Sequence, residues 1–237
     1  PIAVVEAGTG TGKTIAYLVA ALPIARARGK KLVVASATVA LQEQLLLRDL
    51  PDVMQHSGLK FDAALAKGRG RYVCLLKLDH QLSDQGADPL IPLYPDEFLG
   101  AEEELAGPIL EEMIQALGDG SWEGDLDAWP EQLSPSVRRL ITTDQSQCTG
   151  RRCPHIAQCS FFRAREGLDE ADVIVTNHDL VLSDLRLGGG VILPAPEDSL
   201  YVFDEGHQLP AKCLNQFALR FHSCLLYTSD AADEPVC

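Results

Sequence analysis

The sequence contains no uninterrupted apolar run of membrane-spanning length. The longest candidate, Ile15 to Ala25, is interrupted by Pro23 and is followed directly by Arg26. A charged leader with an apolar stretch and a small-residue cleavage site is also missing from the start of the chain. We therefore expect a cytoplasmic protein without a membrane partner. Because the chain opens at Pro1 within an apolar run, we expect the natural N-terminus to lie upstream.

Basic residues are missing from one long segment. Residues 78–137 contain no Lys or Arg but 15 Asp and Glu, in a chain whose net charge is −14. Outside this segment the chain has 20 basic and 19 acidic side chains, so its acidity does not exclude a nucleic-acid partner elsewhere. Leu105, Ile109, Met113 and Leu117 are spaced as one apolar helix face, which we expect to pack against the neighbouring cysteine-containing region.

Four short apolar runs, most of them rich in Val and Ile, predict β-strands. They are Ile2–Val5, Lys31–Ser36, Ala171–Thr176 and Leu200–Phe203. Helical stretches follow the first two, to about residue 27 and over residues 39–48. Short strands that alternate with helices predict an α/β fold, here a P-loop (RecA-like) parallel sheet flanked by helices.

The alternation of strands and helices stops between Lys67 and Arg165. This stretch holds the acidic segment, several prolines and four of the seven cysteines, and it predicts a mainly helical inserted domain. We therefore divide the chain into a first part of the sheet domain at residues 1–66, an inserted domain at 67–166 (below, the insert) and a second part at 167–223. Residues 224–237 resemble the translation of a sequencing-library adapter and are expected to be non-native.

A glycine-rich loop follows the first predicted strand. It comprises Gly8, Thr9, Gly10, Thr11, Gly12, Lys13 and Thr14. Glycines let the backbone approach phosphate oxygens closely, and the N-terminus of the next helix favours an anion. Lys13 is placed to reach the β- and γ-phosphates of ATP, and the Thr14 hydroxyl to ligate Mg²⁺. The loop predicts a nucleotide site without indicating what the nucleotide drives.

Two carboxylates and an imidazole follow the last predicted strand, at Asp204, Glu205 and His207. In an ATPase with a phosphate loop, an Asp at this place holds Mg²⁺ and a neighbouring Glu polarises the attacking water. We expect this acidic box and the phosphate loop to meet at the carboxyl ends of the strands, where parallel sheets bind ligands.

Four cysteines of the insert are spaced as Cys74, then Cys148-x₄-Cys153-x₅-Cys159. Because no export signal precedes them, the pattern favours a metal site over disulfides. Four thiolates hold either an iron–sulfur cluster or a tetrahedral zinc ion, and these spacings leave the metal open. Cys213 stands alone on a predicted helix and is expected to be a buried structural thiol.

Together these motifs resemble those of the DinG-type, XPD-like iron–sulfur helicases of superfamily 2. The resemblance rests on Ala7 at the head of the phosphate loop, on Asp204-Glu-Gly-His207, and on Gly68-Arg-Gly-Arg-Tyr-Val-Cys74 before the cysteine triplet. It covers nearly all of residues 2–220. It implies that a [4Fe–4S] cluster is bound by Cys74, Cys148, Cys153 and Cys159. It also implies that His207 couples ATP hydrolysis to movement on DNA.

The same resemblance implies contacts with DNA. They fall on Ser36, Thr38, Gln42, Arg69, Arg71, Asn177 and His178. The two arginines belong to a basic group around the cysteines that would neutralise phosphates. A hydrogen-bonded turn residue is an equally good interpretation of His178.

The implied activity is that of a monomeric, ATP-dependent DNA helicase that moves 5′ to 3′ on single strands and unwinds duplexes or fork junctions. We expect this chain to be a fragment that lacks the second motor domain and is inactive alone. The alternatives are a YoaA-type paralogue, a P-loop ATPase whose zinc module acts on proteins, and a non-catalytic binding module. Intact Lys13, Asp204 and Glu205 argue against the last of these.

Overall fold

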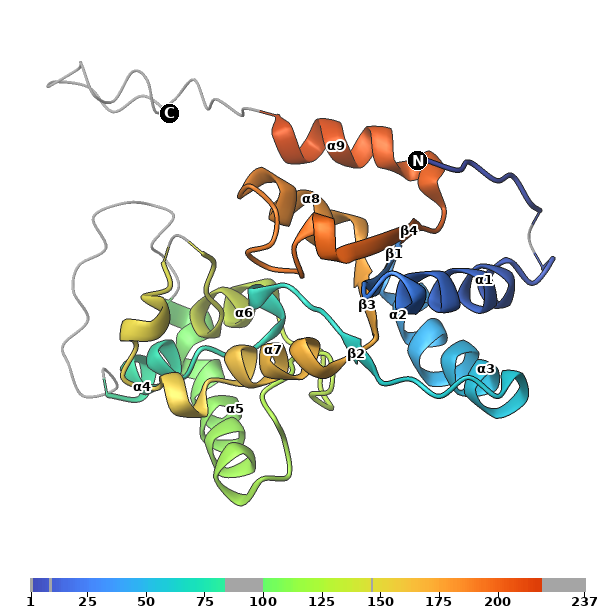
Figure 1. The fold of residues 1–237 in the computed structure, drawn as a ribbon. Helices are drawn as coiled ribbons and strands as arrows, with labels where there is room; N and C mark the ends of the chain where they lie inside the picture. Colours follow the sequence, from blue (N-terminus) through green and yellow to red (C-terminus); the bar gives the residue numbers. More distant parts are fainter. Residues whose placement is uncertain (1, 9, 84–99, 146, 219–237) are drawn as a thin grey trace, which may run out of the picture.

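The computed structural model describes residues 2–8, 10–83, 100–145 and 147–218 (Figure 1). Thr9 of the phosphate loop and the predicted tail at 224–237 lie outside these residues. Four parallel strands form one sheet in the order β2-β3-β1-β4. Their bounds are Lys31–Ser36 for β1, Ala63–Leu65 for β2, Val173–Asn177 for β3 and Ser199–Phe203 for β4. The predicted α/β fold with a parallel sheet is confirmed.

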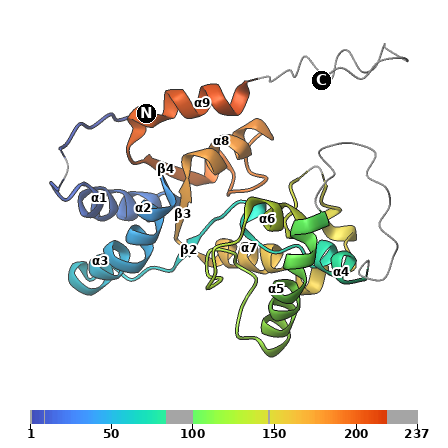
Figure 2. The ribbon, with the colours of Figure 1, turned by 180° about the vertical axis from the view of Figure 1, so that it is seen from behind.

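Helices flank the sheet and make up most of the insert. They are α1 (Lys13–Ala27), α2 (Val39–Gln44), α3 (Leu50–Ser57), α4 (Leu75–Ser83), α5 (Gly100–Asp119), α6 (Pro135–Ile141), α7 (Ser160–Glu170), α8 (His178–Arg186) and α9 (Leu209–Phe217). The front and back views place α4 to α7 together beside the β2 edge of the sheet (Figures 1 and 2). None of the described helices is both long and apolar enough to cross a membrane.

The two faces of the sheet carry separate hydrophobic clusters. Successive side chains of a strand point to opposite faces, so Leu32 and Val34 of β1 pack towards α1 and α3, together with Leu18 and Leu22 of α1. On the other face, Val33 and Ala35 of β1 pack with Ile174 of β3, Leu168 of α7 and Val181 of α8. Burial on both faces explains why β1 is a continuous apolar run in the sequence.

The insert has a hydrophobic core of its own. Met113 of α5 and Ile141 of α6 are fully buried there, beside Val73 and Leu78 from the first cysteine segment. Trp122 and Trp129 contact each other edge to face, with ring centroids 4.7 Å apart. The helical face predicted around Met113 is confirmed, although the side chain of Leu105 lies outside the described residues. Packing thus joins the acidic segment to the cysteine-containing segments.

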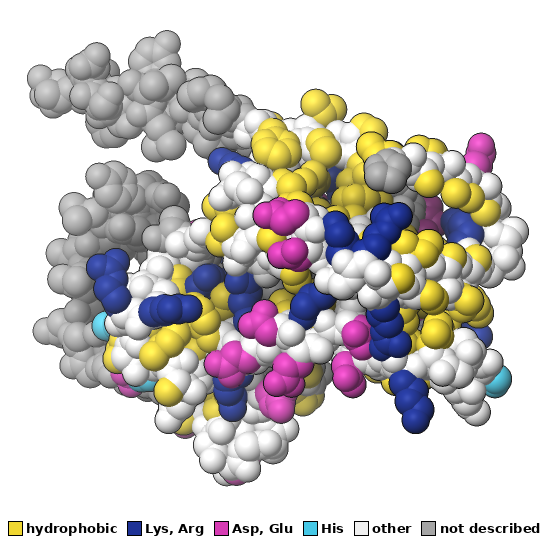
Figure 3. All heavy atoms as spheres, in the orientation of Figure 1, with side chains coloured by type: hydrophobic (Ala, Val, Ile, Leu, Met, Phe, Trp, Pro, Cys, Tyr) yellow, Lys and Arg dark blue, Asp and Glu magenta, His cyan; other side chains and the backbone are white. Residues whose placement is uncertain are grey.

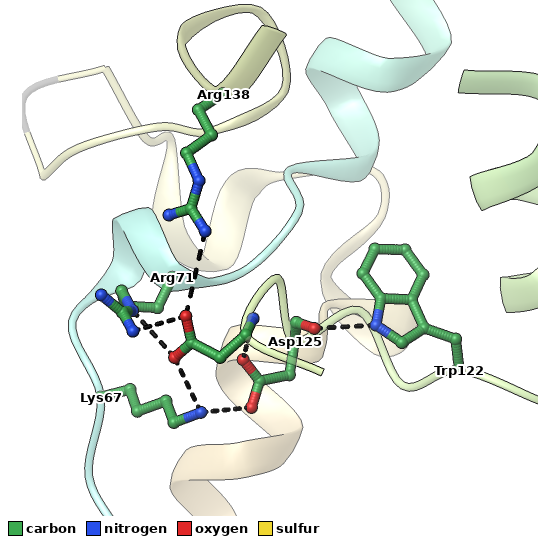
Figure 4. Close-up of polar contacts among 6 residues, drawn as sticks. Lys67, Arg71, Trp122, Asp125 and Arg138 are labelled. Carbon is green, nitrogen blue, oxygen red and sulfur yellow. Dashed lines mark hydrogen bonds and ion pairs between the residues drawn. The ribbon is translucent and has the colours of Figure 1, made fainter. Parts of the chain in front are cut away.

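A cluster of ion pairs joins the start of the insert, just after β2, to the segment that contains Asp125 and Asp127 (Figure 4). Lys67 Nζ lies 2.5 Å from Asp125 Oδ2 and 2.9 Å from Asp127 Oδ2. Arg71 binds Asp127 through Nη2 at 2.5 Å and Nε at 2.9 Å. Burial would raise the pKa of Asp127, but hydrogen bonds donated by Arg71 and Lys67 outweigh burial and hold the pKa below its usual value.

Three features of the structure differ from the sequence predictions. The helix predicted over residues 39–48 continues to Ser57 through a single π-helical turn at Leu45–Asp49. Strand β2 has only three residues and lacks Val and Ile, so it gave no strand signal. Cys213 is half-buried on α9 instead of fully buried.

The prediction of a buried strand at Ile2–Val5 is wrong. The segment has no strand structure, and Ile2, Val4 and Val5 are 95%, 92% and 85% exposed. Among the described residues β4 is an edge strand, so a fifth strand beside it would pair on one side only. Pairing on one side only gains little burial, which does not offset the entropy lost on ordering the backbone.

We predict that Asp127→Asn lowers the unfolding free energy at pH 7 by about 2 kcal/mol, because Lys67 and Arg71 lose a largely buried counter-charge. The stabilisation is present above the unfolded Asp pKa of about 4. It is lost as the pH falls through the lowered native pKa, so wild type and variant converge in acid. Urea unfolding from pH 7 to 3 measures this. Glu111→Gln, on the exposed side of α5, is the control, and a pH-independent difference would contradict the prediction.

Candidate nucleotide and metal sites

The carboxyl ends of three strands meet at one edge of the sheet. Ser36 at the end of β1 is in register with Asn177 at the end of β3. The backbone N–H of Asp204, directly after β4, donates to Ala35 O at 2.9 Å. Helix α1 contacts both β1 and β4. The predicted acidic box therefore lies at the same edge as the start of the helix that follows the phosphate loop.

An ion pair joins the phosphate loop to the acidic box across this edge. Lys13 Nζ donates to Glu205 Oε1 at 2.9 Å, although 192 positions separate the two residues. The Lys13 hydrogen bond, with its charge, lowers the pKa of Glu205, and the same bond raises the pKa of Lys13. His207 Nδ1 lies 3.3 Å from the other carboxylate oxygen of Glu205. The sequence predictions for these three residues fall on one contiguous cluster.

The backbone around this cluster has left-handed conformations where the turns require them. Gly12, which precedes α1, has a φ of 77°, and Gly10 has a φ of 73°. Glu205 is the one non-glycine residue with positive φ among the described residues, at 54°. Such a conformation costs energy for a side chain with a Cβ, and it is typical of functional sites.

Tyr17 and His178 both interact with Asp204 of the acidic box, and neither interaction followed from the sequence. Burial is the largest cause that raises the pKa of Tyr17, and the Asp204 carboxylate adds to it. His178 is fully buried, and its Nε2 lies 2.9 Å from the carbonyl oxygen of Asp204. Because a carbonyl only accepts, this ring nitrogen carries the proton. Burial lowers the pKa of His178 below its ordinary value. Tyr17 follows Thr14 by three residues, which places it on the Thr14 face of α1.

The four cysteines of the insert line a single pocket. Cys74, Cys148, Cys153 and Cys159 are all half-buried and unpaired, and the aromatic rings of Tyr72, Phe161 and Phe162 share the lining. His155 also lines this pocket. In the parts of the chain that the structure describes, no three His, Cys, Asp or Glu converge closely enough to ligate one ion. The thiols therefore surround a hollow and do not close on a point.

Sequence comparison bears on both sites. Residues 2–80 match the DEAD/DEAH box helicase family. The chain is 44% identical over 205 residues to the ATP-dependent DNA helicase DinG of Photobacterium profundum, which covers 86% of the chain and 29% of that protein. It is 36% identical over 207 residues to the Escherichia coli K12 protein of the same name, covering 87% of the chain and 28% of that protein. The chain is a homologue of the DinG-type helicases. It spans under a third of the length of these relatives.

The DNA contacts predicted from the DinG-type resemblance take part in internal structure. Thr38 Oγ1 accepts from Leu41 N–H and caps α2, and Asn177 Oδ1 accepts from Leu180 N–H and caps α8. Ser36, Gln42 and His178 are buried. A strand of DNA would reach these three side chains only if the local structure opened, so the predicted contacts remain predictions.

The two arginines predicted to bind DNA are also engaged within the insert. Arg69 Nη1 lies 2.5 Å from Cys148 Sγ, and its guanidinium stacks on Phe161 at 4.3 Å from the ring centroid. Arg71 pairs with Asp127 as described above. Arg151 and Arg152, close to Cys148 in the sequence, are exposed instead. The basic residues around the cysteines thus divide into an internal and an exposed group.

We predict that Glu205→Gln tightens the binding of fluorescent ADP roughly two- to fivefold, because Lys13 is no longer paired with a carboxylate before the phosphates arrive. Lys13→Ala should weaken the same binding. Fluorescence titration measures both, and Glu197→Gln on an exposed turn serves as the matched control. Weaker ADP binding by Glu205→Gln would show that the ion pair does not compete with the nucleotide.

Proposed function

We propose that this chain is the nucleotide-binding motor domain, with its inserted cysteine domain, of an ATP-dependent DNA helicase. The observation that carries the proposal is the 2.9 Å ion pair between Lys13 and Glu205, which brings the phosphate loop and the acidic box to one edge of a parallel sheet. The homology to DinG-type helicases supplies the likeness to DNA-driven motors.

In the proposed site, ATP binds with its phosphates over the N-terminus of α1. The loop glycines and Thr11 wrap the phosphates, and Lys13 leaves Glu205 to pair with them. Thr14 and Asp204 would hold Mg²⁺ there. Glu205, released from Lys13, then orients the attacking water. His207, beside Glu205, couples ATP hydrolysis to movement on DNA. Conversion of the Lys13–Glu205 pair into a Lys13–phosphate contact is the step that prepares the base.

The cysteine pocket fits a [4Fe–4S] cluster better than a single zinc ion. Zn–S bonds of about 2.3 Å would draw four sulfurs to a common point, whereas the four thiols surround a hollow. An iron–sulfur cluster is larger and takes four cysteine ligands around its outside. When bound, the cluster supplies a rigid link between Cys74 and the segment from Cys148 to Cys159. Residues 67–166 would then form the iron–sulfur domain, between motor segments 1–66 and 167–223.

Single-stranded DNA is the proposed partner, with 5′ to 3′ movement and opening of forks by a monomer. Lys and Arg side chains lie over the part of the surface where Figure 1 shows the insert (Figure 3). Arg151, Arg152 and Arg163 are exposed and lie near the cysteines in the sequence. Exposed cations neutralise phosphates without the cost of breaking internal pairs, so we assign the backbone contacts to these three.

The metal assignment predicts about four irons and four acid-labile sulfides per chain after anaerobic purification. The variant Cys148→Ser should lose both the iron and the sulfide, because the cluster loses one of its four cysteine ligands. Cys213→Ser, which changes the half-buried thiol on α9, should keep both. Zinc without sulfide in oxygen-free protein would contradict the iron–sulfur assignment and favour a P-loop motor with a zinc module.

The DNA assignment predicts that the chain binds a fluorescent oligothymidylate with an affinity that falls steeply with salt. The double variant Arg151→Glu, Arg152→Glu should weaken binding by about tenfold or more and flatten the salt dependence, because two phosphate contacts are lost. Arg28→Glu, an exposed arginine just after α1, is the matched control. Equal loss in both variants would mean that only overall charge matters, and the absence of binding by wild type would favour a protein substrate.

A further inference from the structure

A glycine-rich loop between α8 and β4 is held rigidly by a buried carboxylate. Asp184, 1% exposed in the last turn of α8, accepts the backbone N–H groups of Gly190 and Val191, each at 2.9 Å, and that of Ile192. Gly188, Gly189 and Gly190 have φ values of 105°, 77° and 77°, which residues with a side chain rarely adopt. The loop therefore has a defined conformation, which hydrogen bonds to Asp184 hold in place.

The other side of the same loop is bound by an arginine from the insert. Arg165 of α7 donates from Nη1 to Val191 O at 2.9 Å and from Nη2 to Ile192 O at 2.7 Å. The guanidinium fork thus takes both carbonyls while Asp184 takes the matching N–H groups. Two opposite charges, one from each domain, hold the two faces of one peptide segment.

Arg165 is also connected to the cysteines. Its guanidinium lies 5.0 Å from the ring centroid of Phe161, and Arg69 lies 4.3 Å from the same centroid. Arg69 in turn contacts Cys148 Sγ at 2.5 Å. Helix α7, which carries Phe161 and Arg165, begins directly after Cys159. Contacts therefore run without a gap from the cysteine pocket to the loop.

The loop leads through residues 193–198, which include a 3₁₀ turn at Pro196–Asp198, to β4, the strand that precedes the acidic box. Leu193, the next residue, is buried in the core beneath β1 and β3. Ser199, the first residue of β4, is tied back through its hydroxyl to Ala195 O at 3.0 Å. A displacement of the Arg165–loop contact would therefore be passed to the start of β4, whose other end leads to Asp204.

From this geometry we propose that Arg165 is a positioning residue through which the cysteine domain sets the placement of β4 and the acidic box. The inference rests on the proposed function, in that the cysteines hold a group and the acidic box acts on nucleotide. It assigns to the insert an effect on nucleotide binding that does not pass through DNA. The contact is bidentate, so a lysine cannot replace the arginine.

The test follows amide hydrogen exchange in residues 188–195 and fluorescent Mg·ADP binding by the whole chain, before and after anaerobic loading with iron and sulfide. In wild type, loading should slow the exchange and tighten Mg·ADP binding. In Arg165→Ala the amides should exchange about tenfold faster, and loading to the same iron content should change neither quantity. Glu166→Ala, exposed on the same helix, should behave as wild type.

Equal responses to loading in wild type and Arg165→Ala would overturn the proposal. If Arg165→Ala does not fold, Arg165→Lys carries the same test, because it keeps the charge but reaches only one carbonyl; a normal response in Arg165→Lys would overturn the proposal too. If wild type takes up no iron, the iron–sulfur assignment fails by itself. The coupling is then tested with iodoacetamide on the insert cysteines as the perturbation, in protein whose three other cysteines, Cys213, Cys224 and Cys237, are changed to Ser. The exchange and ADP response should again require Arg165.

Discussion

Parallel pairing of β1 with a neighbour on each side is the constraint on which the rest of the structure depends. The backbone of β1 is hydrogen-bonded to β3 and to β4, and residues 32–36 of this strand are buried. Because all three strands run the same way, their carboxyl ends must meet at one edge. That edge receives Asp204 through its bond to Ala35 O, and α1 packs against the same strands. The contact between Lys13 and Glu205 follows from this arrangement.

The insert follows β2, which lies at the opposite edge of the described sheet from β4. Several of its charged side chains pair with one another within the insert. Lys67 and Arg71 are neutralised by Asp125 and Asp127, whereas Arg69 stacks on Phe161 and contacts Cys148. The acidic segment is therefore more than a solvated face, since two of its carboxylates bind the cations that precede Cys74. Arg151, Arg152 and Arg163, by contrast, are exposed. Hydrophobic side chains gather at the top of the molecule over α8 and α9, where Leu214 and Phe217 are exposed (Figure 3).

Helices and strands with a clear local pattern of apolar residues were predictable from the sequence. The bounds of β1 agree with its apolar run at both ends, and α1 ends at Ala27 as expected. β1 is buried on both faces of the sheet and α1 buries one face against it, so each has a clear apolar pattern in the sequence. Strand β2 and the exposed segment at residues 2–5 were not, because a three-residue strand has no periodicity and an apolar run does not reveal whether a neighbour covers it. Tyr17 and Arg165 gave no signal, because Asp204 and the loop residues that they contact lie far along the chain.

The sequence by itself determined the chemistry: a phosphate loop, an acidic box and four thiols in a fixed order, each recognisable because its residue types and spacing are local. Only the tertiary structure decided which charges face one another. It paired Lys13 with Glu205, used Lys67 and Arg71 inside the insert, and set Arg165 against the loop that Asp184 holds. Contacts of this kind join positions that are tens to hundreds of residues apart, and no local pattern encodes such a distance.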